Sequence, residues 1–283
     1  MREFTVLSII LFYIFTILTD CYILRDILSY CRYRKKAAVW SYSVSSVLFW
    51  GLVTVIAFWP AARESSSLIP LMWMIYTYFL LYFSKLLYVV FSAVGRLFRS
   101  KRKGRRVNYG VYAGIPLSLV AFIFMWWGAL FTRNEIVVEN VTVVSGRLPQ
   151  KFNGYRIVQF SDAHVGTWGN DTSFVSRLVD RINSLDPDLI VFTGDVVNRE
   201  TSEMEPFLSV LSRLKARDGV YSVLGNHDYG DYMDWSFPSE RDSNNALMRM
   251  WQRQIGWRML NNGHTFISRQ GDSIALIGVE NWG

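Results

Sequence analysis

The sequence predicts a membrane protein in two parts, with four transmembrane helices in residues 1–131 and a layered α/β domain in residues 132–283. Of the 283 residues, 51% are hydrophobic and only 19% are charged, whereas an ordinary soluble domain has about 25% charged residues. The first part has 15 Lys and Arg against 4 Asp and Glu, and the second has 15 against 19. In the second part, short apolar runs alternate with amphipathic segments, which is typical of α/β domains.

The charge and the cysteines narrow the possible functions of the second part. The overall charge of +7 combines +11 in the apolar part with −4 in the polar part, so the high isoelectric point does not indicate nucleic-acid binding. We therefore expect no nucleic-acid partner. Cys21 and Cys31 both lie in the apolar part, so a metal site in the polar part must use nitrogen and oxygen ligands.

Four apolar stretches are long enough to cross a bilayer, which takes about 20 helical residues. They are residues 4–24, 37–59, 68–94 and 107–131. The first stretch has no small-residue cleavage site before the Arg25-Asp26 break, so we interpret it as a retained span and not as a signal peptide.

The basic residues of the short loops predict the orientation of these spans. The first loop contains Arg25, Arg32, Arg34, Lys35 and Lys36, and the third contains Arg96, Arg99, Lys101, Arg102, Lys103, Arg105 and Arg106. The second loop has only Arg63. By the positive-inside rule, the first and third loops face the cytoplasm, and the α/β domain lies on the extracytoplasmic side of the cell membrane.

One charged residue, Lys85, lies inside the third span. A charge within the membrane can mark an ion pathway. We favour a structural interpretation, because Lys85 lies toward the cytoplasmic end of its span and its side chain can extend to the headgroups.

The α/β domain is expected to begin with a strand or a short strand pair at residues 136–144. Core strands and amphipathic helices should then alternate. The expected strands are 155–160, 189–192, 220–224 and 274–279, and the helical patterns are Phe174, Leu178, Ile182 and Leu185, then Phe207, Val210, Leu211 and Leu214, then Leu247, Met250 and Trp251.

Polar clusters follow each of the first three core strands. They are Asp162-Ala163-His164, Gly194-Asp195 with Asn198 beyond, and Gly225-Asn226-His227-Asp228. Each cluster alone could be an ordinary polar turn. Because the carboxyl ends of strands in such sheets converge, we expect the three clusters to meet in one crevice.

Two divalent ions about 3.5 to 4 Å apart would explain this set of residues, since such a pair needs a bridging carboxylate. Asp195 is the natural bridge. Asp162 and His164 can close on one ion, and Asn226 offers a neutral oxygen to the other. His227 is placed to donate a proton to a leaving oxygen, and we expect Asp228 to orient its ring.

These three clusters resemble the first signature blocks of the calcineurin-like metallophosphoesterases. With Leu148-Pro149 and Gly154-Tyr155 upstream, residues 136–283 look most like the membrane-anchored bacterial branch of that family. The resemblance implies a two-sheet sandwich flanked by helices, a dimetal centre, and hydrolysis of phosphate esters. By position it also implies one role for each site residue: Asp162 and His164 bind the first metal, Asp195 bridges, Asn226 binds the second metal, and His227 is the acid or transition-state group.

The end of the chain departs from the family pattern. The resemblance implies two further histidine blocks that complete both metal shells, whereas this sequence stops at Gly283. Gly263-His264 resembles part of the last block, but Phe266 stands where a second histidine should be. We therefore expect His264 to be an ordinary loop or strand-end residue, and the domain to be truncated at its carboxyl end.

The sequence supports three functional hypotheses. The first is a membrane-anchored phosphoesterase with two divalent ions, of Mn, Fe or Zn, acting on a phosphate mono- or diester at or near the lipid bilayer. The second is a pyrophosphatase for a nucleotide-diphospho-lipid such as an acylated UDP-glucosamine, which requires the site on the cytoplasmic face. The third is a non-catalytic membrane binding or signalling protein that retains the fold. A transporter is less well supported, because Lys85 is its only evidence.

The predicted orientation can be tested with a reporter fused after residue 135. We expect alkaline phosphatase to be active at this position and a reporter that needs the cytoplasm to be inactive, because basic loops are retained inside. The opposite result would reverse the orientation and favour the nucleotide-lipid substrate.

Overall fold

The computed structural model describes residues 6–31, 33–58, 69–98, 100–102 and 105–281. The chain forms two compact units. A helical unit contains Arg2–Ala61 and Pro70–Glu135, and a sheet unit consists mainly of Ile136–Gly283.

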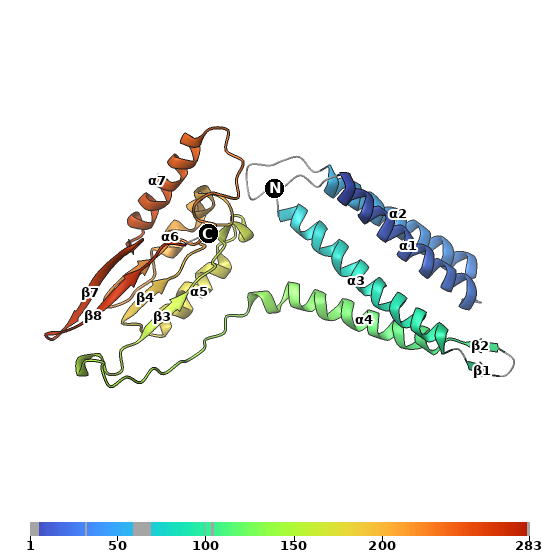
Figure 1. The fold of residues 1–283 in the computed structure, drawn as a ribbon, viewed down its shortest axis with the longest axis horizontal. Helices are drawn as coiled ribbons and strands as arrows, with labels where there is room; N and C mark the ends of the chain where they lie inside the picture. Colours follow the sequence, from blue (N-terminus) through green and yellow to red (C-terminus); the bar gives the residue numbers. More distant parts are fainter. Residues whose placement is uncertain (1–5, 32, 59–68, 99, 103–104, 282–283) are drawn as a thin grey trace. The chain divides into compact units, whose positions relative to one another are not determined.

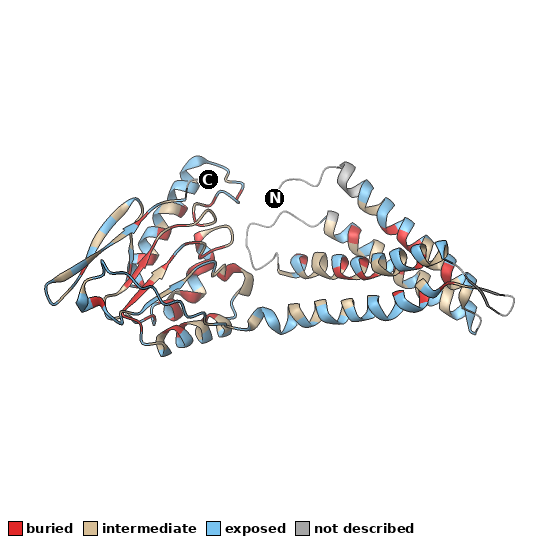
Figure 2. Ribbon diagram, turned by 60° about the horizontal axis from the view of Figure 1, so that its bottom comes forward, coloured by how far each residue is buried: buried red, intermediate tan, exposed pale blue. Residues whose placement is uncertain are grey.

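The helical unit consists of four long helices (Figure 1). They are α1 (Val6–Tyr30), α2 (Lys35–Ala57), α3 (Ile69–Leu97) and α4 (Tyr109–Leu130), with a short hairpin of β1 (Ser100–Arg102) and β2 (Arg105–Val107) between α3 and α4. Within the described residues, the segments Lys35–Ile56, Ile69–Leu97 and Tyr109–Asn134 are long and apolar enough to cross a membrane. Few side chains of α4 are buried (Figure 2), as expected for an apolar helix that contacts lipid. The predicted helical membrane region is confirmed, with α1 matching the first predicted span.

The first helix is longer than the sequence suggested. The Arg25-Asp26 pair was expected to end the span, whereas α1 continues to Tyr30. The helix continues because Asp26 is buried and accepts hydrogen bonds from α3, from the side chains of Tyr88, Ser92 and Arg96. A buried carboxylate with charged and neutral donors does not need to leave the helix for water.

Asp20 forms a second buried charge cluster between α1, α2 and α3. Its carboxylate accepts hydrogen bonds from Lys85 Nζ at 2.7 Å, Tyr42 Oη at 2.6 Å and Tyr82 Oη at 2.9 Å. Trp50 Nε1 donates a fourth at 3.1 Å. The expectation that Lys85 extends toward the headgroups is therefore wrong: the ammonium group points into the bundle, because a carboxylate is available there.

Helices α3 and α4 approach closely at their connected ends. A Cβ atom on Gly110 would lie 1.9 Å from the carbonyl oxygen of Phe91, so only glycine fits at this contact. Asn108 caps α4 by accepting a hydrogen bond from Gly110 N, and its amide donates to the carbonyl of Ser92. The backbone of α4 is thus held against α3 by packing and by one buried amide.

The sheet unit contains two sheets and three helices. A parallel sheet has the order β3 (Ile157–Phe160), β4 (Leu189–Phe192), β5 (Val220–Ser222) and β6 (Trp257–Met259), and an antiparallel pair consists of β7 (Gly263–Arg269) and β8 (Asp272–Gly278). The helices are α5 (Ser173–Ser184), α6 (Leu208–Leu211) and α7 (Pro238–Gln254), and short 3-10 turns are η3 (Gln150–Phe152), η4 (Val165–Trp168) and η5 (Thr201–Phe207). A further 3-10 turn, η2 (Thr132–Asn134), follows α4 in the helical unit.

The parallel sheet has an apolar layer on each face. Ile190 and Phe192 belong to the larger core, which includes buried residues of α5, α6 and α7. Leu189 packs in a smaller cluster with Ile267 of β7, on the opposite side of the alternating strand. Figure 2 shows buried residues of this unit on strands, on helices and in loops. The predicted α/β fold is confirmed, and its second sheet has two strands within the described residues.

Five elements differ from the sequence-based expectations. Residues 136–144 form no strand, because none of the described strands pairs with this segment. Val144 in this segment is 90% exposed. The pattern from Phe207 to Leu214 yields only the four-residue α6 after η5, which contains Pro206. In α7, Met250 is exposed and Gln252 is buried, since Gln252 accepts a hydrogen bond from Ser222 of β5. Strands β6 and β7 were not predicted.

The Asp20 cluster can be tested by charge removal. We expect Asp20→Ala to destabilise the helical unit by roughly 3 to 5 kcal/mol, because it leaves the Lys85 ammonium buried without its anion. The double variant Asp20→Ala with Lys85→Met should recover most of this loss. Thermal unfolding in detergent measures both, with Cys21→Ser, an exposed neighbour on α1, as the control. A double variant no more stable than Asp20→Ala would contradict this role.

Candidate metal centre

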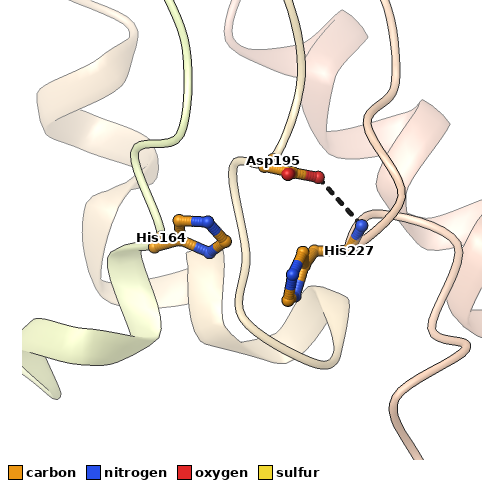
Figure 3. Close-up of side chains that lie close together, drawn as sticks. All are labelled: His164, Asp195 and His227. Carbon is orange, nitrogen blue, oxygen red and sulfur yellow. Dashed lines mark hydrogen bonds between the residues drawn. The ribbon is translucent and has the colours of Figure 1, made fainter. Parts of the chain in front are cut away.

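The three polar clusters occupy loops that follow β3, β4 and β5 at the carboxyl edge of the parallel sheet (Figure 3). The first loop is joined to the second by backbone hydrogen bonds, from Asp162 N to Gly194 O at 2.9 Å and from His164 N to Asp195 O at 3.1 Å. The parallel register of β3 and β4 ends immediately before these bonds, so the two loops continue the pairing of their strands.

Asp228 joins the second loop to the third. Its fully buried carboxylate accepts backbone hydrogen bonds from Asp195 N at 2.9 Å, Val196 N at 2.8 Å and Gly225 N at 3.0 Å. Val197 N adds a fourth at 3.3 Å. Burial raises the pKa of Asp228 to about 6, while these donors favour its ionised form and oppose that shift. The carboxylate is therefore ionised at neutral pH.

The expected role of Asp228 is thus wrong. It was predicted to orient the ring of His227, but the ring instead has Nδ1 2.7 Å from the carbonyl oxygen of Asn198. Asp228 is fully occupied by backbone donors, because its side chain turns inward from the loop.

Close approach of the loops requires two glycines. A Cβ on Gly194 would lie 2.3 Å from Gly225 N, and a Cβ on Gly225 would lie 2.2 Å from Asp195 Oδ1. Three site residues next to this contact also have left-handed backbone conformations, with φ of 53° for Asp162, 39° for His164 and 62° for Asp195. Such conformations cost about 1 to 3 kcal/mol each and concentrate at functional sites.

His164, Asp195 and His227 converge from the three loops (Figure 3). Their potential ligand atoms all lie within 4.8 Å of one another. Nδ1 of His164 lies 3.1 Å from the carbonyl of Val197, and Nδ1 of His227 faces the carbonyl of Asn198. Since a carbonyl only accepts, both Nδ1 atoms carry hydrogen and both Nε2 atoms remain available. The carboxylate of Asp195 also accepts a hydrogen bond from His227 N at 2.8 Å.

This donor set fits a divalent cation. The imidazole of His164, held by a backbone carbonyl, and the carboxylate of Asp195 are ligand types found in Mn, Fe or Zn sites, and His227 lies beside them. Of the predicted ligands, Asp162 lies beside the cluster, with its Oδ1 3.7 Å from His164 Nε2. Asn226 donates from its Nδ2 to Tyr232 Oη at 2.9 Å, so its Oδ1 is the atom available as a ligand.

His264 lies away from this cluster, whereas Tyr232 touches it. His264 lies on the exposed strand β7, where its ring contacts Phe266 at 5.8 Å, and it is not part of the described cluster. Tyr232 was missed by sequence reasoning, although its ring stacks on His227 at 4.1 Å. A single tyrosine in a turn gives no sequence signal for such a contact.

Comparison with known families agrees with this geometry. Residues 155–280 match the family described as calcineurin-like phosphoesterase. Residues 2–133 match the family described as probable calcineurin-like phosphoesterase, transmembrane domain. The two models together match residues 2–133 and 155–280, so both parts of the chain are similar to calcineurin-like phosphoesterases that carry a transmembrane domain.

Individual relatives include both animal and bacterial proteins. A transmembrane protein with metallophosphoesterase domain from Danio rerio is 27% identical over 202 residues, 68% of this chain and 43% of the relative. A UDP-2,3-diacylglucosamine pyrophosphatase from Chlamydia trachomatis is 37% identical over 131 residues, 45% of this chain and 39% of the relative. The matched part of the chain thus spans less than half the length of these relatives. No solved structure matches.

The linking role of Asp228 predicts a large effect on stability. We expect Asp228→Ala to destabilise the sheet unit by roughly 3 to 5 kcal/mol and to lower its affinity for Mn²⁺, because four backbone N–H groups lose one shared acceptor. Asp242→Ala, an exposed position on α7, should change stability by less than about 0.5 kcal/mol. Thermal unfolding followed by tryptophan fluorescence measures both. Equal stability of the two variants would show that the loops do not depend on Asp228.

Proposed function

We propose that this protein is a membrane-anchored, metal-dependent phosphoesterase that hydrolyses a phosphate mono- or diester. The observation that supports this most directly is the convergence of His164, Asp195 and His227 from three separate loops. The similarity of residues 155–280 to the calcineurin-like phosphoesterases supports the same reaction class.

In this proposal, Asp162 and His164 hold one divalent cation, Asp195 is shared by two, and Asn226 binds the second. Such cations supply hydroxide from bound water and neutralise charge on phosphoryl oxygens. The protein contributes a fixed set of ligands, since the ring of His164 is oriented by the carbonyl of Val197.

His227 has the proposed role of proton donor to the leaving oxygen. Its Nδ1–H is directed to the carbonyl of Asn198, so proton donation requires the imidazolium form of His227, whose second hydrogen is on Nε2 and passes to the leaving oxygen. The T-shaped contact with His164, at 4.7 Å and 90° between rings, keeps this edge of His227 next to the cluster.

The proposed substrate is an ester held at or near the bilayer, and the proposed location of the sheet unit is extracytoplasmic. The membrane helices and the basic loops support these two points. A nucleotide-diphospho-lipid is the second candidate, favoured by the similarity to two chlamydial proteins named UDP-2,3-diacylglucosamine pyrophosphatase, at 37% and 35% identity. That candidate requires the cytoplasmic orientation, so the reporter after residue 135 separates the two.

The proposed roles predict different defects in two variants of the protein expressed from its complete reading frame. We expect Asp195→Asn to lower turnover by several decades and to reduce metal content, because a shared carboxylate is lost. His227→Asn should retain metal and lower turnover by roughly 10² to 10⁴-fold. A nitrophenyl ester, whose leaving group needs no protonation, should partly rescue only His227→Asn. Metal analysis and steady-state assays measure these effects.

The matched control is His264→Ala on the exposed strand β7, which should change neither metal content nor turnover appreciably. Equal loss of metal from the His227 and Asp195 variants would make His227 a ligand instead of an acid. Turnover that is independent of added metal and resistant to chelators would contradict the proposed reaction. Metal binding without turnover on any ester would favour the non-catalytic alternative.

A further inference from the structure

A tyrosine outside the predicted cluster touches two of its members through different parts of its side chain. The ring of Tyr232 stacks on the ring of His227, with centroids 4.1 Å apart and an interplanar angle of 14°. Its hydroxyl accepts a hydrogen bond from Asn226 Nδ2 at 2.9 Å. Both partners belong to the Gly225-Asn226-His227-Asp228 block.

The hydrogen bond between Asn226 and Tyr232 uses the nitrogen of the Asn226 amide. An amide has one acceptor oxygen and one donor nitrogen, and only the oxygen can bind a cation. Because Nδ2 is directed to the phenol, Oδ1 is the atom left free. With its Nδ2 bonded to Tyr232, Asn226 has Oδ1 available for its proposed role as a ligand.

The ring of Tyr232 restrains the imidazole of His227 by covering one of its two broad faces. Nδ1 is held by the carbonyl of Asn198, and the ring of His164 meets the imidazole at 90°. The parallel phenol ring of Tyr232 covers one broad face. Rotation of the imidazole about its Cβ–Cγ bond would break both the stack and the hydrogen bond to Asn198.

Tyr232 is itself held in place by its own turn. Its neighbour Asp231 forms an ion pair with Arg241 of α7. The indole of Trp235 donates a hydrogen bond to the carbonyl of Gly230 at 2.7 Å and so closes the turn that contains Tyr232. The Tyr232 side chain is 48% exposed, so its burial contributes little to the core, and it contacts the site residues Asn226 and His227.

From this geometry we propose that Tyr232 is a positioning residue, which orients the amide of Asn226 for cation binding through its hydroxyl and holds the imidazole of His227 for proton donation through its ring. The inference rests on the proposed function for the part that concerns His227. The part that concerns Asn226 depends only on cation binding.

Two variants separate the hydroxyl from the ring. Tyr232→Phe keeps the stack and removes the hydrogen bond, so we expect Mn²⁺ affinity to fall about 2- to 10-fold, as for the loss of one hydrogen bond. Its turnover at saturating Mn²⁺ should stay near that of the parent. Tyr232→Leu removes both contacts, so it should show the same loss of Mn²⁺ affinity and, in addition, a fall in kcat of about 3- to 10-fold with little change in KM.

The measurements are Mn²⁺ titration by electron paramagnetic resonance and steady-state kinetics, both on the detergent-solubilised full chain. Phe237→Leu is the control, since Phe237 lies in the same loop, is 64% exposed and belongs to neither contact. A larger kcat defect of Tyr232→Leu on an alkyl ester than on a nitrophenyl ester would support the ring's action through His227, because only the alkyl leaving group needs a proton.

The inference is overturned if both Tyr232 variants bind Mn²⁺ as tightly as Phe237→Leu does, or if Tyr232→Phe and Tyr232→Leu have the same kcat. Mn²⁺ affinity that falls only in proportion to the melting temperature would also overturn it, since that result means a general loss of structure. If the parent binds Mn²⁺ but hydrolyses no ester, the proposed function fails, and the Mn²⁺ titration still decides whether the hydroxyl of Tyr232 positions Asn226.

Discussion

The geometry of the candidate site depends on one buried carboxylate. Asp228 accepts four backbone hydrogen bonds and thereby joins the loop after β4 to the loop after β5. The loop after β3 is attached in turn through backbone bonds to Gly194 and Asp195. The loops after three short strands are thus held together by backbone contacts, and the Nε2 atoms of His164 and His227 face the shared site.

The helical unit also contains buried carboxylates that are stabilised by several hydrogen-bond donors, here in membrane helices. Asp20 and Asp26 lie in an apolar helix, and each is surrounded by donors from neighbouring helices. A buried charge is tolerated in either unit only when its donors are supplied by other segments. These carboxylates specify how segments pair, since any shift of α1 along α3 would separate Asp20 from Lys85.

The sequence predicted what depends on local pattern. Apolar length identified four spans, and polar residues after β3, β4 and β5 identified the loops that converge on His164, Asp195 and His227. It did not predict contacts between distant side chains. Lys85 and Asp20 are 65 residues apart, and nothing local indicates that they pair. Asp228 was assigned to its neighbour His227, because sequence proximity does not show that the carboxylate turns inward. Residues 136–144 have the composition of a strand, but a strand also needs a partner.

Residues 135–149 connect η2 at the end of the helical unit to η3 in the sheet unit, and apart from the turn around Arg147 they are extended. A segment of fifteen residues spans at most about 50 Å when fully extended. Its length therefore limits the height above the bilayer that η3, where it enters the sheet unit, can reach. A substrate whose phosphate is attached to a lipid always lies within that height, and encounter with it becomes a search over a surface.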